Sequence, residues 1–133
     1  MTFSANLSLP YIQSSQAQKH VTHNDGIRRL DALVQLSVQS VSDTAPPAAP
    51  TDGQRYIVPV GATGDWAGQS GKVAAYEENA WAFYSAQTGW LSWVEDVAKQ
   101  FIFDGTSWGE LTTTPNTQNL AQVGVNATAD ATN

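Results

Sequence analysis

The two histidines, His20 and His23, are the first candidates for chemistry in this chain. Spaced three residues apart, they would share one face of a helix, as metal ligands do. A zinc or iron site needs a third and usually a fourth ligand, and the sequence offers no cysteine and no HExxH spacing. Asp25 or Asp31 could lend oxygens, but hydrogen bonding is the commoner role for such histidines. We therefore expect no metal site and no cofactor.

Two pairs of adjacent carboxylates, Glu77-Glu78 and Glu95-Asp96, are the second candidates. Glycoside hydrolysis uses two carboxyl groups that face each other across a cleft. Adjacent residues on a strand point to opposite faces, so these pairs are better explained as solvated turn charges. The sequence also lacks a GxSxG motif, a phosphate-binding glycine loop and a nucleophile with an evident base. We expect no enzymatic activity.

The composition argues against further classes of partner. The chain has 133 residues, 14% of them charged, with a net charge of −6, so it offers no basic face for nucleic acid or an anionic membrane. It contains no cysteine, which excludes disulfides and thiolate chemistry. Its start lacks the basic and apolar regions of a signal peptide, and no apolar run approaches the ~20 residues that span a bilayer.

The elements that would position these side chains begin with an arm. Residues 1–13 combine apolar side chains with Pro10, which favours an extended conformation before it. Such an arm usually binds another surface, and its predicted docking residues are Phe3, Leu7, Leu9 and Tyr11.

A helical region follows the arm. Ser14 or Ser15 could cap its start, and Asn24-Asp25-Gly26 predicts a break or a new N-cap before a stronger helix over residues 27–41. Two helical pieces or one kinked helix are expected.

The stronger helix has a narrow apolar face. Its apolar residues follow a three-then-four spacing, and the same heptad counted backwards reaches the two histidines as a polar layer. The predicted oligomer interface consists of His20, His23, Ile27, Leu30, Val34 and Val41. A trimer is the first expectation, although the pattern suits two strands about as well, and a ring of five at a capsid vertex is a further alternative. If the histidines line this seam, their protonation at about pH 6 would place like charges in it and weaken the association.

Beyond the helix the sequence changes character. Residues 42–53 hold three prolines and no large apolar side chain, which indicates an extended spacer. Residues 54–111 carry aromatic residues between glycine-bearing turns, a pattern of short antiparallel strands. Residues 112–133 form a polar tail with a single charge, too poor in apolar side chains to fold alone.

The strand region contains an internal repeat. Residues 72–81 align without a gap with residues 99–108, which places Tyr76 on Phe103 and Trp81 on Trp108. Each copy reads as a hairpin in which the aromatic residue before the turn pairs with the tryptophan after it. Residues 60–66 resemble a degraded third copy.

The tryptophans allow two interpretations. Most are expected to fill the core, because a small sheet of hairpins needs large side chains. Exposed tryptophans on hairpins also stack on sugar rings, and Trp90 and Trp93, near the Gly89 turn, are the candidates for a glycan-binding pair.

Several motifs resemble a phage-derived family of alphaproteobacterial prophages and gene transfer agents. They are QAQKHVTHN at residues 16–24, RRLDALVQL at 28–36, and the PP, DG and RYIV elements at 46–47, 52–53 and 55–58. Asp25-Gly26 departs from that family, in which an acidic residue and a helix former are expected. The resemblance continues through GW-x-x-WV at residues 89–94, the Asp104-Gly105 turn with Trp108 and the residues 124–133, so it covers nearly the whole chain.

The resemblance implies a virion protein, assembled in the bacterial cytoplasm, that forms the oligomeric base or attachment domain of a head or tail fibre or spike used in host recognition. Its partners would be further copies of itself, a capsid or tail structural protein, and a distal fibre protein or host glycan. The alternative is a carbohydrate-binding module that contacts host surface glycan directly. The expected fold is α+β, with an N-terminal arm and helix (1–41), a spacer (42–53), an antiparallel β module (54–111) and an extended tail (112–133).

Overall fold

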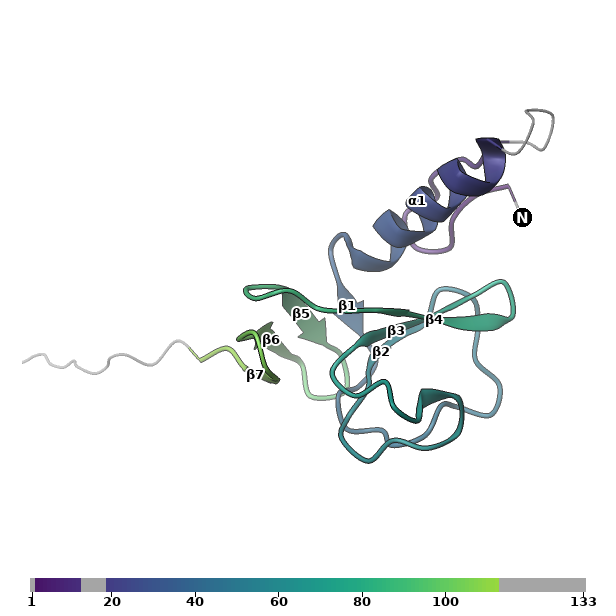
Figure 1. Ribbon diagram of the computed structural model, residues 1–133. Coiled ribbons are helices and arrows are strands. Elements are labelled where there is room, and N and C mark those ends of the chain that lie inside the picture. Colours follow the sequence, from purple (N-terminus) through teal and green to yellow (C-terminus); the bar gives the residue numbers. More distant parts are fainter. Residues whose placement is uncertain (1, 13–18, 113–133) are drawn as a thin grey trace, which may run out of the picture.

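The computed structural model describes residues 2–12 and 19–112 (Figure 1). The elements in chain order are α1 (Lys19–Leu33), β1 (Ser37–Val38), β2 (Arg55–Ile57), the 3₁₀ turn η1 (Gly64–Trp66), β3 (Val73–Glu77), β4 (Ala80–Tyr84), β5 (Leu91–Val94), β6 (Lys99–Phe103) and β7 (Trp108–Glu110). The predicted α+β class is confirmed. The proposed caps Ser14 and Ser15, and the tail beyond residue 112, lie outside the described residues.

The strands form two sheets, with the orders β1-β5-β6-β7 and β2-β3-β4. All pairs are antiparallel except β1 with β5. The parallel pair needs a long crossover, and the whole three-stranded sheet supplies it. Hydrogen bonds join the two sheets where β1 passes β2, from Gln39 N to Arg55 O at 2.8 Å and from Ile57 N to Ser40 O at 3.1 Å.

The main core lies where the end of α1 meets both sheets. Its fully or nearly fully buried members come from the helix, from β1 and from four further strands, and they are Ala32, Leu36, Val38, Ile57, Val73, Ala75, Tyr84 and Val94. Trp108 packs against this cluster and its Nε1 donates to Gly71 O at 2.9 Å, which ties β7 to the chain leading into β3. The helix end and both sheets therefore share one core.

A second cluster is aromatic and sits under the loop between β2 and β3. Trp66 is 0% exposed and packs against Tyr56 and Trp81, with ring centroids 5.0 Å and 5.3 Å away. The prediction that the tryptophans mainly build the core holds for Trp66. Trp93, one of the two tryptophans expected at the surface, is 41% exposed.

The predicted hairpin repeat is confirmed. Tyr76 lies opposite Trp81 in β3 and β4, with ring centroids 5.1 Å apart, and Phe103 lies opposite Trp108 in β6 and β7, at 5.4 Å.

The turns of the two hairpins differ in construction. In the first, Glu78 and Asn79 have φ of 50° and 68°, the left-handed pair of a two-residue turn that follows strand twist. In the second, the Asp104 carboxylate accepts hydrogen bonds from Thr106 N and Ser107 N, which lowers the pKa of Asp104. The third copy expected at residues 60–66 is wrong, because Gly64–Trp66 forms η1.

The helix differs from the prediction at two places. α1 continues through Asn24-Asp25-Gly26 as one helix, because the Asn24 side chain binds the arm instead of capping a new segment. The helix also ends at Leu33 and does not reach Val41. Gln35, with φ of 54°, turns the chain so that β1 pairs with β5, and Val41 packs against the main core.

Candidate functional site

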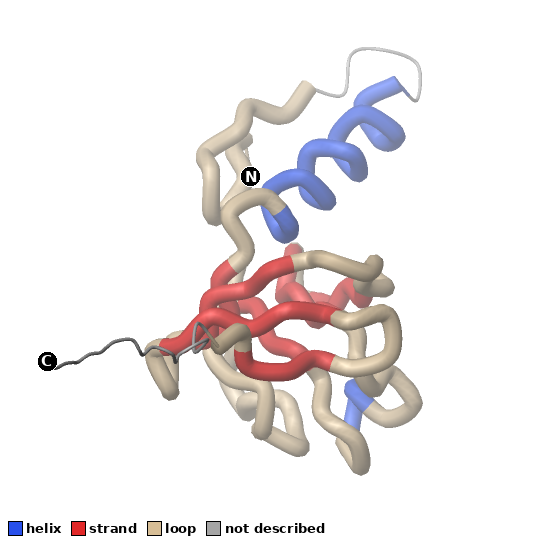
Figure 2. The backbone as a smooth tube through the Cα atoms, turned by 90° about the vertical axis from the view of Figure 1, so that its left-hand side faces the viewer, coloured by secondary structure: helices blue, strands red, loops and turns tan. Residues whose placement is uncertain are grey.

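The helix stands out from the β sheets and meets them at its C-terminal end (Figures 1 and 2). Ala32, near that end, is 0% exposed, and its carbonyl oxygen accepts a hydrogen bond from Arg55 Nη1 at 3.1 Å. Such a contact satisfies one of the carbonyls that every helix end leaves without a helical partner. The rest of α1 carries the arm on one flank and leaves another face open.

The arm folds into a compact loop that is bound to α1 by Asp31. This carboxylate is 3% exposed and accepts hydrogen bonds from Ser4 Oγ at 2.6 Å, Asn6 N at 2.9 Å, Asn6 Nδ2 at 3.0 Å and Leu7 N. A buried carboxylate is stable when several donors replace its water, and here the arm supplies all of them.

Asn24 holds the other end of the arm. Its Oδ1 accepts from Ile12 N at 2.9 Å and its Nδ2 donates to Ile12 O at 3.0 Å, so the amide pairs with the backbone as a neighbouring strand would. Asn24 and Asp31 are two helical turns apart and therefore lie on the same face of α1. The arm runs antiparallel along this face.

The predicted docking residues divide into two groups. Phe3 is 53% exposed and Leu7 is 37% exposed, whereas Leu9 and Tyr11 are half-buried. The Arg28 guanidinium lies over the Tyr11 ring at 5.0 Å from its centroid. The arm thus binds its own helix through backbone and polar groups while Phe3 and Leu7 stay accessible; their docking to another protein stays a prediction.

Two arginines link the helix to the sheet of β2, β3 and β4. Arg28 makes ion pairs with Glu78 at 2.6 Å and with Asp25 at 3.1 Å. Arg29 lies over the Tyr84 ring at 5.0 Å. These contacts brace the helix against the first hairpin.

A carboxyl with an altered pKa lies at this junction. Burial raises the pKa of Glu77 to about 7, although the hydrogen bond from Tyr84 and the charge of Arg28 act in the opposite direction. Burial, then the neighbouring Glu77, raises the pKa of Tyr84 to about 12. The Tyr84 hydroxyl donates to Glu77 Oε1 at 3.3 Å. This pair links the start of the first hairpin's turn to the end of β4.

The predicted seam is only partly on the helix surface. Leu30 is 51% exposed and Val34, just past the helix, is 43% exposed. Ile27 is half-buried and His23 is exposed, while the side chain of His20 lies outside the described part of the chain. Val41 lies off the helix altogether. We call Leu30 and Val34 the apolar ridge.

Beside the ridge lies an apolar depression that the sequence did not predict. Two adjoining hollows of about 430 Å³ and 310 Å³ share three leucines, Leu33, Leu36 and Leu91. Trp93 lines the first hollow, and Trp90 and Val34 line the second. We call the two hollows together the apolar trough. The helix end forms one wall and β5 the other.

The glycan candidates therefore belong to this trough. Trp93 is 41% exposed and Trp90 is half-buried, and they line different hollows. Their place beside the leucines suits an apolar partner as well as a sugar ring.

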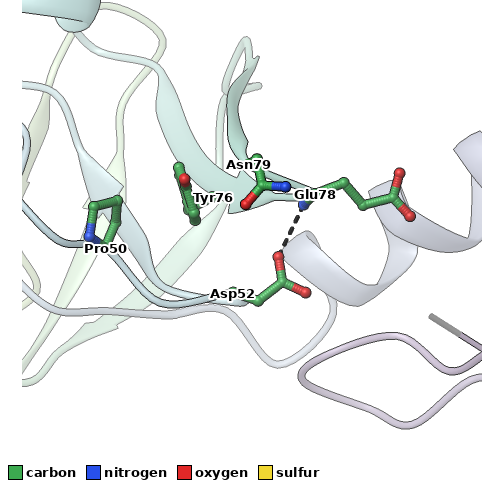
Figure 3. Close-up of a pocket in the computed structure, with 5 residues that line it drawn as sticks. All are labelled: Pro50, Asp52, Tyr76, Glu78 and Asn79. Carbon is green, nitrogen blue, oxygen red and sulfur yellow. Dashed lines mark hydrogen bonds between the residues drawn. The ribbon is translucent and has the colours of Figure 1, made fainter.

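A separate polar hollow of about 390 Å³ lies at the turn of the first hairpin, lined by Pro50, Asp52, Tyr76, Glu78 and Asn79 (Figure 3). Asp52 Oδ1 accepts a hydrogen bond from Glu78 N at 2.9 Å, which holds the turn. The Glu78 carboxylate points away toward α1, where Arg28 binds it (Figure 3). An aromatic ring with amide and carboxylate oxygens is a surface on which a small polar ligand could bind.

Within residues 2–12 and 19–112, no three histidine, cysteine or acidic side chains gather as metal ligands would. No helix in this part of the chain is long and apolar enough to cross a membrane.

Residues 23–109 match DUF2793, a family described as a protein of unknown function. The chain belongs to the DUF2793 family. The match begins within α1 and ends in β7, so the DUF2793 unit includes most of the helix, the spacer and both sheets. No curated protein matches the chain.

Sequence reasoning missed the two residues that organise the arm of this DUF2793 chain. The sequence predicts a helix break at Asn24 and offers Asp31 only as a possible metal ligand. Asn24 and Asp31 lie two helical turns apart on one face, beside the apolar seam. This spacing of two polar residues is the sequence pattern that indicates a segment bound along that face. The trough had no such signal, because α1 and β5 are far apart in sequence.

The arm clamp predicts the behaviour of Asp31→Ala. Removing the carboxylate leaves Ser4, Asn6 and Leu7 without their acceptor, so stability should fall by about 1–3 kcal/mol. The amides of Asn6 and Leu7 should exchange faster with deuterium. Asp25→Ala on the same helix is the matched control, since its exposed ion pair contributes less than about 1 kcal/mol. Unchanged exchange in Asp31→Ala would contradict the clamp.

The Glu77 carboxyl predicts a pH dependence of folding. Its pKa rises from 4.5 to about 7 in the folded chain, so the folded state holds this proton more tightly than the unfolded state. The resulting stabilisation is complete below 4.5 and is lost as the pH rises through about 7. Glu77→Gln should flatten this slope in urea titrations between those values and be the more stable chain above them. Glu110→Gln, on an exposed strand, serves as the control and should keep the slope.

Proposed function

We propose that this chain is the oligomeric base or attachment domain of a head or tail fibre or spike, in a phage or gene-transfer-agent particle assembled in the bacterial cytoplasm. Its role is structural and non-enzymatic: copies associate, bind a capsid or tail protein, and carry a distal fibre protein used in host recognition. The motif resemblance of the sequence supports the particle, and the exposed apolar ridge and trough support association.

The observation that carries the proposal is the ridge beside the trough. Leu30, Val34, Leu91 and Trp93 are each at least 41% exposed. Val34, Leu91 and Trp93 line the trough, and Leu30 lies one helical turn before Val34. Contiguous exposed apolar side chains on a small domain mark an interaction surface, because water contact with them is unfavourable. Phe3 and Leu7 on the arm add a second exposed apolar site, which we assign to the capsid or tail protein.

The mass of the chain in solution tests this proposal. Light scattering should give an oligomer, with a trimer as the first expectation, and Leu30→Ser with Val34→Ser should shift the mass toward the monomer. Val60→Ser is the control, because Val60 is 86% exposed in the loop between β2 and β3 and lies far from α1. Point substitutions are better than deletion of residues 1–41, which would remove Leu36 and Val38 from the core. A monomer at every concentration would refute association.

Carbohydrate binding is the second candidate, favoured by the exposure of Trp93 and by the hollow at Tyr76. If the chain binds glycan, a glycan array should show binding by the native chain and loss of that binding in one of three variants. Loss in Trp90→Ala or Trp93→Ala would place sugar in the trough, and loss in Tyr76→Ala would place it in the polar hollow of Figure 3. An array with no binding removes this function.

A further inference from the structure

We propose that the apolar trough of one copy receives the apolar ridge of a second copy, so that the helix of each chain lies against β5 of its neighbour. This inference rests on the proposed function, and it specifies which surfaces of two copies meet. The alternative geometry, in which the helices pair with one another along a common seam, makes a different contact.

The trough suits a short apolar segment. Its walls carry Leu33, Leu36, Leu91 and the two indoles of Trp90 and Trp93, together with the uncharged polar residues Gln35, Ser37 and Gln100. No ionised side chain lines either hollow. A charged peptide or a phosphate group would therefore find no partner there, whereas leucine and valine side chains would lose contact with water.

The ridge supplies such side chains on the same molecule. Leu30 and Val34 are one helical turn apart and project on one face, with 51% and 43% of their surface exposed. α1 runs unbroken to Leu33, so Leu30 cannot bend into the trough of its own chain. A neighbouring copy can bring it there.

Net charge favours the helix-to-sheet contact over the other pairings. Residues 19–33 carry three basic and two acidic side chains, a net charge of +1, whereas residues 34–112 carry three basic and nine acidic ones, a net charge of −6. Two sheets would meet with strongly like charges, whereas two helices at +1 each would repel only weakly. A helix against a neighbouring sheet pairs opposite charges, which favours association and orientation.

The ridge and the trough are different surfaces, so each contact pairs Leu30 of one copy with Leu91 of another. A two-fold dimer makes this contact twice, and a rotation of higher order makes it once between neighbours and closes into a ring. Val34 belongs to the ridge and also borders the trough, so the two contacts of one copy lie next to each other. Adjacent contacts of this kind fit a two-fold dimer or a small ring.

Engineered cysteines test this geometry cleanly, because the chain has no cysteine of its own. Leu30→Cys and Leu91→Cys chains carrying different tags are co-expressed, purified together and oxidised. The exposed positions, 51% and 48%, tolerate the change, and circular dichroism with the light-scattering mass verifies each variant. The expected product is a disulfide between the two different chains, several-fold above the level obtained when Val60→Cys replaces Leu91→Cys.

Each other outcome overturns the inference. Disulfides that join only Leu30→Cys chains to one another would show that helices pair along their seam. An oligomeric mass without either disulfide would place the contact elsewhere, while the proposed function would stand. A monomeric mass for the native chain would remove the proposed function and the inference together.

Discussion

The parallel pairing of β1 with β5 decides where the helix stands on the sheets. Only two residues of β1 take part, with Trp93 N donating to Leu36 O at 3.0 Å and Glu95 N to Val38 O at 2.9 Å. These bonds follow directly after the helix, and Leu36 and Val38 are buried between them. Because the chain has only a few residues between Leu33 and β1, the helix end is held beside β5. The ridge and the trough are neighbours for this reason.

Polar contacts then determine which face of the helix remains free. The buried carboxylate of Asp31 and the amide of Asn24 bind the arm to one flank. Arg28, which also lies over Tyr11 of the arm, and Arg29 brace the helix against the first hairpin. These contacts need specific partners, whereas the face that carries Ile27, Leu30 and Val34 ends in exposed apolar side chains at the sheet end of the helix. Within residues 2–12 and 19–112, Leu30 and Val34 stay exposed on this face, and self-association is the use that we propose for it.

Much of the fold could be predicted from local patterns. The paired aromatic residues of the two hairpins, the α+β class and the proline-rich segment without regular structure all follow from spacing within short stretches. The helix end could not be predicted in this way. The apolar residues Leu36, Val38 and Val41 continue a helical spacing, but their burial against both sheets stabilises an extended chain more than another turn of helix. Val41, which the helical spacing predicts for the oligomer interface, therefore packs against the core instead.

The sequence by itself determined what needs only neighbours along the chain: the hairpins, the absence of a cysteine or a metal-ligand spacing, and the charge that disfavours nucleic acid. The tertiary structure alone decided what needs residues far apart to meet. Asp31 became the anchor of the arm because the arm folds back along the helix and brings Ser4 and Asn6, 27 and 25 residues away in sequence, to its carboxylate. Trp93 remained at the surface because β1 and the helix end cover only part of β5. Periodicity within one segment contains no information on which distant segment will pack against it, since that choice depends on the total burial and hydrogen bonding of the whole chain.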